Sequence, residues 1–505
     1  MNVKSKIIVT VILALLGLAP RAAVAAEKEV ARAKPNIVYI LADDLGYGDV
    51  HCLNPQRGKI LTPNMDKLAA QGMVFTDAHG SSSVCTPSRY SILTGRYNWR
   101  SRLQAGVLGS YAPSLIPKSR YTVPAMLKEN GYATACVGKW HLGWHWPRKE
   151  KGMDFSKPIT GGPTAIGFDY YFGTDAPNYP PYCFIENDRT VGIPSVPLPK
   201  RLLENHLASK QGIALPNWKL EAILPTITDK ACEFIGRQAK AGKPFFLYFP
   251  LTSPHTPLAV AHEWQGRSGL GRYADFVMET DAMVGRVLEA IEQNGVMDNT
   301  LVIMSSDNGC APYIGVAELE KNGHYPSARF RGYKADAWDG GHRIPFIARW
   351  PGVVKPGSIC GQMVCQMDLM ATCADILGAK LPDNAGEDSV SLLPLLRGGA
   401  EPTRQVLVHH SIHGKFAIRE GKWKLLLCPG SGGWGTPNDA AARKEKLPAV
   451  QLYDMSTDES ERRNLQAEHP EIVARMTKLL EKIVADGRST PGAKQKNDTK
   501  VDISK

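Results

Sequence analysis

Two pairs of polar residues stand where predicted strands end. Short apolar runs predict two strands, and their ends are followed directly by Asp43-Asp44 and Asp307-Asn308. In an open α/β sheet, ligands bind beyond the carboxyl ends of the parallel strands. Three carboxylates and one amide oxygen at that edge would form an oxygen-only cage that suits Ca²⁺ or Mg²⁺. Either pair alone is also an ordinary turn sequence, so the metal site needs a second signal.

That second signal is a cysteine at the start of a predicted helix. Residues 83–95 read SVCTPSRYSILTG, with the cysteine at position 85 and a proline at position 87. Proline suits the first turn of a helix. Cys85 is therefore expected just before the positive end of that helix, where anions bind.

At this segment the chain resembles the type I, formylglycine-dependent sulfatase family, in particular its arylsulfatase-like members and bacterial glycan sulfatases. The family signature C-x-P-S-R followed by x-x-x-L-T-G is matched at every fixed position. A second signature is matched by residues 131–141, which read GYATACVGKWH. Weaker similarity runs from Pro35 to Leu465, so the resemblance covers nearly the whole mature chain.

The resemblance implies a nucleophile made from Cys85. In this family a maturation enzyme oxidises the motif cysteine to formylglycine, whose hydrate carries two hydroxyl groups. One hydroxyl attacks sulfur and the other later expels sulfate. The resemblance also implies one bound calcium ion, with the ligands Asp43, Asp44, Cys85, Asp307 and Asn308.

Five further residues match the family's catalytic set. Arg89 and Lys139 match the cations that hold the diol, and His141 matches the base that acts during sulfate release. His255 matches the acid for the leaving oxygen, and Lys334 matches the lysine that grips the sulfate. Lys139, His255 and Lys334 are thereby expected to bind the substrate. The alternative readings are a loop histidine for His255 and a solvated lysine for Lys334.

The sequence DGGHR at 339–343 follows Lys334 and also fits the family pattern. From position alone, the residues that could line the substrate pocket are Asp175, Asn178, Trp338 and His342. Loop packing explains each of these four equally well.

The order of predicted elements favours an α/β fold. Strands are expected at 36–41, 133–137, 244–251, 301–304 and 344–348, and helices at 62–72, 123–129, 229–238 and 273–293. Such alternation indicates a parallel or mixed sheet with helices on both faces, which the resemblance makes alkaline phosphatase-like. Segment 161–200, rich in Pro, Gly and Tyr, is expected to be a long surface loop. After residue 400, close short strands and a helix at 471–484 predict a smaller antiparallel sheet.

These patterns give four expected segments. They are a signal peptide at 1–26, a catalytic α/β domain at 27–400, a C-terminal α+β subdomain at 401–490 and a disordered tail at 491–505. The first has a basic start, a short apolar run and small residues before its end. The mature protein is thus expected to be exported, periplasmic or extracellular, with no transmembrane segment.

The composition bears on the charge of the substrate and on the kind of metal site. The formal net charge of +11 suits a polyanionic substrate, whereas no arginine-rich helix or basic–aromatic pattern points to nucleic acid. The ten cysteines are scattered without a CxxC pair, which argues against a zinc site. No disulfide pairing is predicted, and several cysteines are expected in the core.

Together these features predict a sulfatase that hydrolyses O-sulfate esters of a sulfated glycan, of the galactose or N-acetylgalactosamine type. Two alternatives stay open at this point. One is a phosphoester hydrolase of the alkaline phosphatase-like superfamily, which usually carries Ser or Thr where Cys85 stands. The other is a sulfated-glycan binding protein without catalysis.

Overall fold

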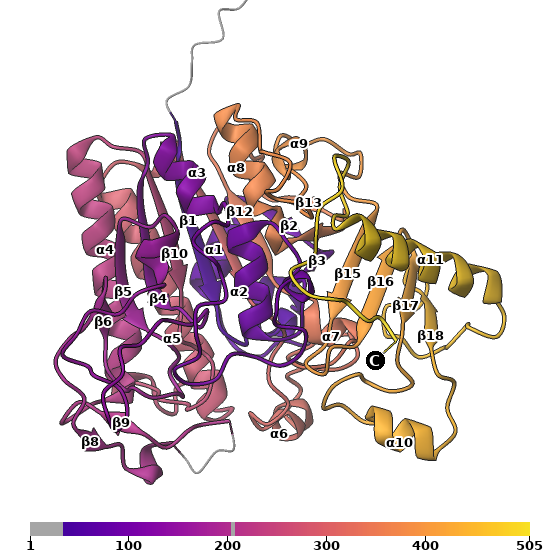
Figure 1. Ribbon diagram of the computed structural model, residues 1–505, viewed down its shortest axis with the longest axis horizontal. Helices are drawn as coiled ribbons and strands as arrows, with labels where there is room; N and C mark the ends of the chain where they lie inside the picture. The colour runs from indigo at the N-terminus through magenta and orange to yellow at the C-terminus, as the bar shows by residue number, and fades with distance from the viewer. Residues whose placement is uncertain (1–33, 204–207, 505) are drawn as a thin grey trace, which may run out of the picture. The chain divides into compact units, whose positions relative to one another are not determined.

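Five parallel strands form the middle of a ten-stranded mixed sheet in the computed structural model, which describes residues 34–203 and 208–504 (Figure 1). The order across the sheet is β13 (Ser358–Cys360), β2 (Met73–Phe75), β12 (Phe346–Arg349), β11 (Thr300–Ser306), β1 (Asn36–Ala42), β10 (Phe245–Pro250), β4 (Ala133–Lys139), β5 (Tyr170–Thr174), β6 (Ile185–Glu186) and β7 (Arg189–Thr190). The parallel strands run from β11 to β5. Antiparallel pairs flank them on both sides.

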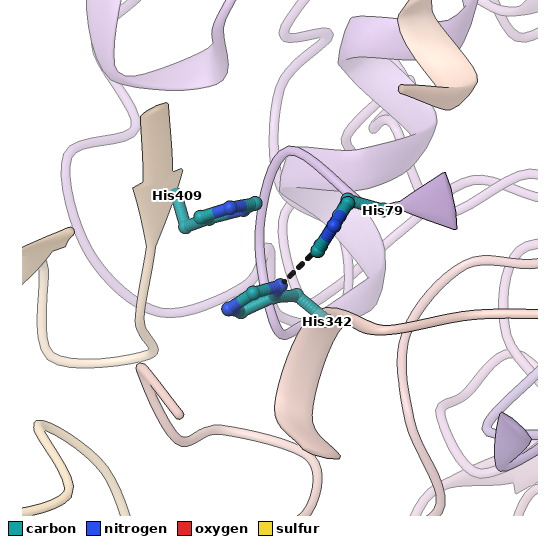
Figure 2. Close-up of side chains that lie close together, drawn as sticks. All are labelled: His79, His342 and His409. Atoms are coloured by element: carbon teal, nitrogen blue, oxygen red, sulfur yellow. Dashed lines mark hydrogen bonds between the residues drawn. The ribbon is translucent and has the colours of Figure 1, made fainter. Parts of the chain in front are cut away.

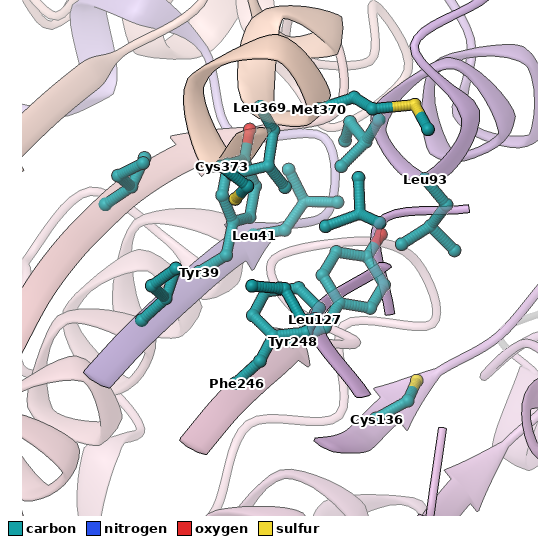
Figure 3. Close-up of a cluster of buried hydrophobic side chains, with 14 of the residues drawn as sticks. Tyr39, Leu41, Leu93, Leu127, Cys136, Phe246, Tyr248, Leu369, Met370 and Cys373 are labelled. Carbon is teal, nitrogen blue, oxygen red and sulfur yellow. The ribbon is translucent and has the colours of Figure 1, made fainter. Parts of the chain in front are cut away.

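Helices cover both faces of this sheet. Successive side chains of a strand point to opposite faces, so each strand contributes to a core on either side. Tyr39 and Leu41 of β1 join one core cluster, and Val38 and Ile40 join the other. The first cluster includes α2 (Cys85–Thr94), α3 (Val123–Glu129), α8 (Leu369–Leu377) and α9 (Leu393–Leu396). The second includes α1 (Pro63–Ala70), α4 (Ile223–Ala241), α5 (Arg272–Gln293) and α6 (Val316–Lys321). Figure 3 shows the first cluster, where strand residues meet Leu93, Leu127 and Met370 of the helices.

The C-terminal part is an antiparallel sheet with one long helix. Its strands are β15 (Val406–His410), β16 (Phe416–Glu420), β17 (Trp423–Leu426) and β18 (Gln451–Asp454). Helix α11 (Pro470–Asp486) places Met476, Leu480 and Ile483 in the same core cluster as Leu407 and Leu425 of the sheet. The short elements that remain are β3 (Ala78–His79), β14 (Val364–Cys365), β8 (Val196–Pro197), β9 (Ile213–Ala214), α7 (Asp339–His342) and α10 (Asp439–Lys444).

The predicted fold class is confirmed, since the structure has the mixed sheet, helices on both faces and the smaller antiparallel sheet. The interpretation of segment 161–200 as a surface loop was wrong. It contains β5, which pairs in parallel with β4 and places Tyr171 and Phe172 in the core. Proline and glycine around this short strand hid its apolar run. The predicted boundaries at residues 400 and 490 stay predictions.

The tail also differs from the expectation of disorder. Asp498 accepts from Arg96 at 3.1 Å and donates its backbone N–H to the Arg100 carbonyl at 2.7 Å. Asn497 accepts from the Arg100 guanidinium at 3.0 Å. Both arginine side chains are buried, and buried guanidinium groups need polar partners. The polar residues of the tail therefore serve as hydrogen-bond partners for these two buried arginines.

Three further expectations can be compared with the structure. The predicted signal peptide lies outside the described residues. Within residues 34–203 and 208–504, no helix is long and apolar enough to cross a membrane. All ten cysteines are unpaired, and eight of them are buried, as expected for small apolar core residues.

Three buried histidines join the two parts of the fold (Figure 2). His79 lies on β3, His342 at the end of α7 and His409 on β15. The Nδ1 atoms of His79 and His342 lie 3.1 Å apart, and the rings of His342 and His409 stack at 3.6 Å. Burial and nearby positive groups lower the pKa of His79 to about 4 and hold the pKa values of the other two well below the ordinary range.

This histidine cluster predicts an acid-sensitive fold. Because the unfolded histidines bind protons below a pKa of ~6.5 and the folded ones do not, the free energy of unfolding falls as the pH drops through that value. His409→Gln removes one such histidine. Between about pH 7 and pH 5 the free energy of unfolding of this variant should therefore fall by ~2 kcal/mol less than that of the wild type. Urea unfolding at both pH values measures this, with exposed His469→Gln as the control. An unchanged pH dependence in His409→Gln would contradict the assignment.

Candidate active site

The two acidic pairs meet because β1 and β11 are parallel neighbours. Their register pairs Ala42 with Ser306, so the residues that follow leave the sheet side by side. The Asp44 backbone N–H donates to Asp307 Oδ1 at 3.1 Å, and Asn308 Nδ2 donates to Asp44 Oδ1 at 2.8 Å. All four side chains are buried. The predicted convergence of the two strand ends is therefore what the structure shows.

Three cations surround these carboxylates, and two of them contact Asp43 and Asp307. Lys139, the last residue of β4, donates from Nζ to both oxygens of Asp43 at 2.9 and 2.7 Å. Arg89 on α2 donates from Nε and Nη2 to Asp307 Oδ2 at 3.0 and 2.7 Å. Arg89 Nη2 also lies 3.4 Å from Asp43 Oδ1. The cluster thus holds one sheet strand and one helix to the two acidic strand ends.

Lys334 and His255 share the remaining carboxylate. Lys334 Nζ donates to Asp44 Oδ2 at 2.6 Å, and His255 Nε2 lies 3.6 Å from the same oxygen. His255 follows the end of β10, and Lys334 lies in the loop between β11 and β12. Both side chains are buried, so the alternative of a solvated lysine does not describe Lys334. His255 lies in a loop, but its side chain is turned into the buried cluster.

Cys85 is buried and is the first residue of α2, whereas the sequence predicted it just before the helix. Its thiol lies close enough to affect the electrostatics of Arg89, Asp307 and Lys334. The left-handed Gly95 closes the same helix. The cysteine therefore faces the cluster of carboxylates and cations from the positive end of a helix.

His141 lies just beyond β4 with a backbone φ of 54°, in the left-handed region. Its Nε2 donates to the Leu108 carbonyl at 2.9 Å, and its buried Nδ1 has no hydrogen-bond partner among the described residues. Burial and Lys139 lower the pKa of His141 to about 3, so the ring is neutral at neutral pH. A neutral imidazole with a free Nδ1 lone pair can accept a proton at that atom.

The carboxylates differ in their proton affinity. Burial opposes ionisation of Asp43, but Lys139, His255 and Arg89 hold the pKa of that carboxyl well below its ordinary value. Burial, reinforced by Asp43 against the effect of Arg89, raises the pKa of Asp307 to about 8. Ionisation of Asp307 is therefore less favourable than ionisation of Asp43, and a bound cation would favour it.

The donor set fits a calcium ion. Asn308 Oδ1 is buried and has no hydrogen-bond partner among the described residues. That oxygen lies with the carboxylates of Asp43, Asp44 and Asp307, and hard oxygen ligands of this kind suit Ca²⁺. The nearby oxygens of Asp43 and Asp44 and a nitrogen of His255 also lie within 4.8 Å of one another.

The four pocket candidates divide into two groups. Asp175 is buried, accepts from Trp144 Nε1 at 3.2 Å and contributes to the electrostatics of His141, so it lies beside the site. Asn178 is buried and donates to the Ala208 carbonyl at 2.6 Å. Trp338 and His342 are buried in contacts with the C-terminal sheet instead. Packing accounts for His342, whereas Trp338 also lines a cavity beside Gly332 and Tyr333.

Two aromatic residues near the site were missed. The ring of Tyr179 meets His141 edge-on at 5.7 Å, and Tyr313 affects the electrostatics of Lys334. Each stands in a loop without periodic pattern, so the sequence carries no local signal for either.

Comparisons with known proteins agree with this geometry. Residues 35–379 match the Sulfatase protein family. The chain is 36% identical to an N-acetylgalactosamine-6-O-sulfatase of Bacteroides thetaiotaomicron, covering 89% of this chain and 93% of that protein. It is 35% identical to human arylsulfatase A, covering 88% and 87% of the two chains.

Solved structures are also similar. One, from a study of glycosaminoglycan metabolism by Bacteroides thetaiotaomicron, has a TM-score of 0.79 and 34% identity, covering 89% of this chain and 99% of that chain. Another, Ps i-CgsB in complex with a neocarrahexaose, has a TM-score of 0.67 and 26% identity, covering 89% and 92%. These matches favour sulfate-ester chemistry over the phosphoester hydrolase alternative. The chain therefore belongs to the sulfatase family and is a sulfuric ester hydrolase.

Proposed function

We propose that this sulfatase removes O-sulfate from a sulfated sugar of the galactose or N-acetylgalactosamine type, using a nucleophile made from Cys85. The observation that carries the proposal is the buried cluster at the sheet edge, in which three carboxylates and three cations surround the first residue of α2. The sugar class is supported by the relatives named for N-acetylgalactosamine-6-sulfate and by the oligosaccharide complex. Calcium, formylglycine and export are part of the same proposal.

Cys85 is the residue that a separate maturation enzyme converts to formylglycine. The hydrated aldehyde would supply two hydroxyl groups, one for attack on sulfur and one for the later release of sulfate. Arg89 and Lys139 contact Asp307 and Asp43, where their positive charges would hold the nucleophile in place and offset its charge.

The calcium ligands would be Asp43, Asp44, Asp307, Asn308 and the modified residue 85. The ion would neutralise sulfate oxygens and favour the ionised hydroxyl. The unpartnered Asn308 oxygen and the raised pKa of Asp307, about 8 through burial, support the presence of a cation here.

Two histidines move the protons. His141 accepts a proton at Nδ1, because its Nε2–H is held by the Leu108 carbonyl. Burial and Lys334 lower the pKa of His255 to about 4, and the negative charge of a bound sulfate would raise it again. His255 then protonates the departing sugar oxygen, while Lys139 and Lys334 hold the sulfate with it.

The first prediction from this proposal concerns Cys85 itself. In protein made together with a maturation enzyme, the peptide that contains Cys85 should be lighter by about 18 Da, the difference between a thiol side chain and an aldehyde. The Cys52 peptide is the internal control and keeps its thiol mass. Cys85→Ala should abolish hydrolysis. Full activity with only the thiol form would sink the proposed nucleophile, and a converted protein that hydrolyses no sulfate of the galactose or N-acetylgalactosamine type would contradict the proposed sugar class.

The second prediction concerns calcium. Ca²⁺ at 100 times its dissociation constant should raise the free energy of unfolding by about 2.7 kcal/mol. Asp307→Ala should lose this increase, and chelation should lower the activity of the wild type until Ca²⁺ is restored. Calorimetric unfolding with and without the ion measures the effect. An equal increase in Asp307→Ala would place the ion elsewhere.

The third prediction separates the acid from the rest of the site. His255→Ala should lower kcat by about 10²–10⁴ for a sulfated sugar, whose alcohol leaves poorly without a proton. The loss should be much smaller for 4-nitrophenyl sulfate, because its phenolate is a good leaving group. Exposed His262→Ala, in the same loop, should change neither rate. Equal losses on both substrates would argue against His255 as the acid.

A further inference from the structure

A cavity of about 320 Å³ lies against the loop that carries Lys334. Its lining includes four arginines, from the segment after β1, from the loop between β11 and β12 and from the C-terminal part: Arg57, Arg329, Arg331 and Arg462. This concentration of guanidinium groups is separate from the carboxylate cluster. Guanidinium groups bind sulfate and carboxylate with paired hydrogen bonds.

Three of the four guanidinium groups form no ion pair within the described part of the chain. Arg329 forms an ion pair with Glu459. Arg57, Arg331 and Arg462 have no carboxylate oxygen within 4.0 Å among residues 34–203 and 208–504. Arg57 lies 3.4 Å above the ring of Tyr325. Stacking fixes the plane of a guanidinium group and leaves its N–H groups to face a ligand.

Two carboxylates also line the cavity, and their oxygens are already used. Glu320 accepts from the Tyr333 hydroxyl at 2.5 Å. Asp336 accepts from the backbone N–H groups of Tyr333 and Gly435 at 3.1 and 2.7 Å. Both accept hydrogen bonds from neutral donors and neither forms an ion pair with an arginine of the cavity, although their charges offset part of the positive charge there.

One short loop links the cavity to the candidate active site. Arg331 and Tyr333 line the cavity, while Lys334 Nζ contacts Asp44. Arg331 and Lys334 are three residues apart, so their Cα atoms lie at most about 11 Å from each other. The same loop thus carries one residue of each site.

An aromatic surface adjoins the same loop. Trp434 is 41% exposed, and its ring lies 6.0 Å from that of Tyr313, whose pKa responds to Lys334 and Asp44. The next residues, Gly435 and Thr436, line the cavity. Exposed aromatic rings with a polar partner nearby pack well against the C–H face of a sugar.

We infer that the arginine-lined cavity is a second anion subsite, which binds another sulfate or carboxylate of the glycan whose ester is cleaved. Trp434 supports the sugar ring between the two sites. The enzyme thus selects oligosaccharides that carry at least two negative groups over sulfated monosaccharides. This inference rests on the proposed glycan sulfatase function.

The test compares two substrates in the formylglycine-containing enzyme. One is a tetrasaccharide of alternating uronic acid and 6-sulfated N-acetylgalactosamine, and the other is the 6-sulfated monosaccharide. Arg57→Gln/Arg462→Gln should raise KM for the tetrasaccharide at least about tenfold, as expected when charged hydrogen bonds are lost, with kcat unchanged. Kinetics on the monosaccharide should stay within about twofold. Trp434→Ala should act in the same direction, and exposed Arg397→Gln is the matched control.

Binding without turnover separates this inference from the proposed function. Calorimetry with the tetrasaccharide uses Cys85→Ala, with and without the two arginine substitutions. Weaker binding after the substitutions supports the subsite even if the wild type hydrolyses neither substrate, in which case the proposed function fails alone. Normal hydrolysis with unchanged binding overturns the subsite alone. Equal KM changes on both substrates, or inorganic sulfate that binds as tightly as the tetrasaccharide, would also overturn it.

Discussion

Compensation of buried charge is the constraint on which this structure depends. Asp43, Asp44 and Asp307 are removed from water at the edge of the sheet, and each contacts a cation. Removal of one partner from a buried ion pair typically costs about 3–5 kcal/mol, because the other charge stays buried. The three cations come from α2, from β4 and from the loop after β11. The same charges that could hold a sulfate therefore also fasten three distant segments to the acidic ends of β1 and β11.

The parallel sheet explains why this cluster forms at one edge. The register of β1 and β11 places the residues after Ala42 and Ser306 next to each other, and β4 ends nearby at Lys139. At that edge the backbone is strained, since Asp44 and His141 have φ values of 65° and 54°. Such conformations cost about 1–3 kcal/mol each for residues with a side chain and persist where packing fixes them. These backbone conformations direct the side chains of Asp44 and His141 toward the cluster.

The C-terminal part contacts the segments that form this edge. Lys424 of β17 contacts Asp339 at 2.7 Å, shortly after the loop with Lys334, and the histidine cluster joins β15 to α7. The tail hydrogen-bonds to Arg96 and Arg100, which follow α2. These contacts hold the helix of Cys85 and the loop of Lys334 in place. The smaller sheet thus serves as a scaffold for the candidate site and adds Trp434 and Arg462 at its border.

The amino-acid sequence by itself determined the fold class, the order of the main strands and helices, and the ten residues that the structure brings together around Asp44 and Cys85. The fold class and the order of elements rest on apolar periodicity, whereas the ten site residues follow from the family resemblance that the signatures at 83–95 and 131–141 carry. Only the tertiary structure decided that β5 belongs to the sheet, that the tail is ordered and that His342 packs against His409. It alone assembled the arginine-lined cavity, whose members lie hundreds of residues apart. Such sites have no local pattern, because long-range packing rather than sequence spacing sets which side chains meet.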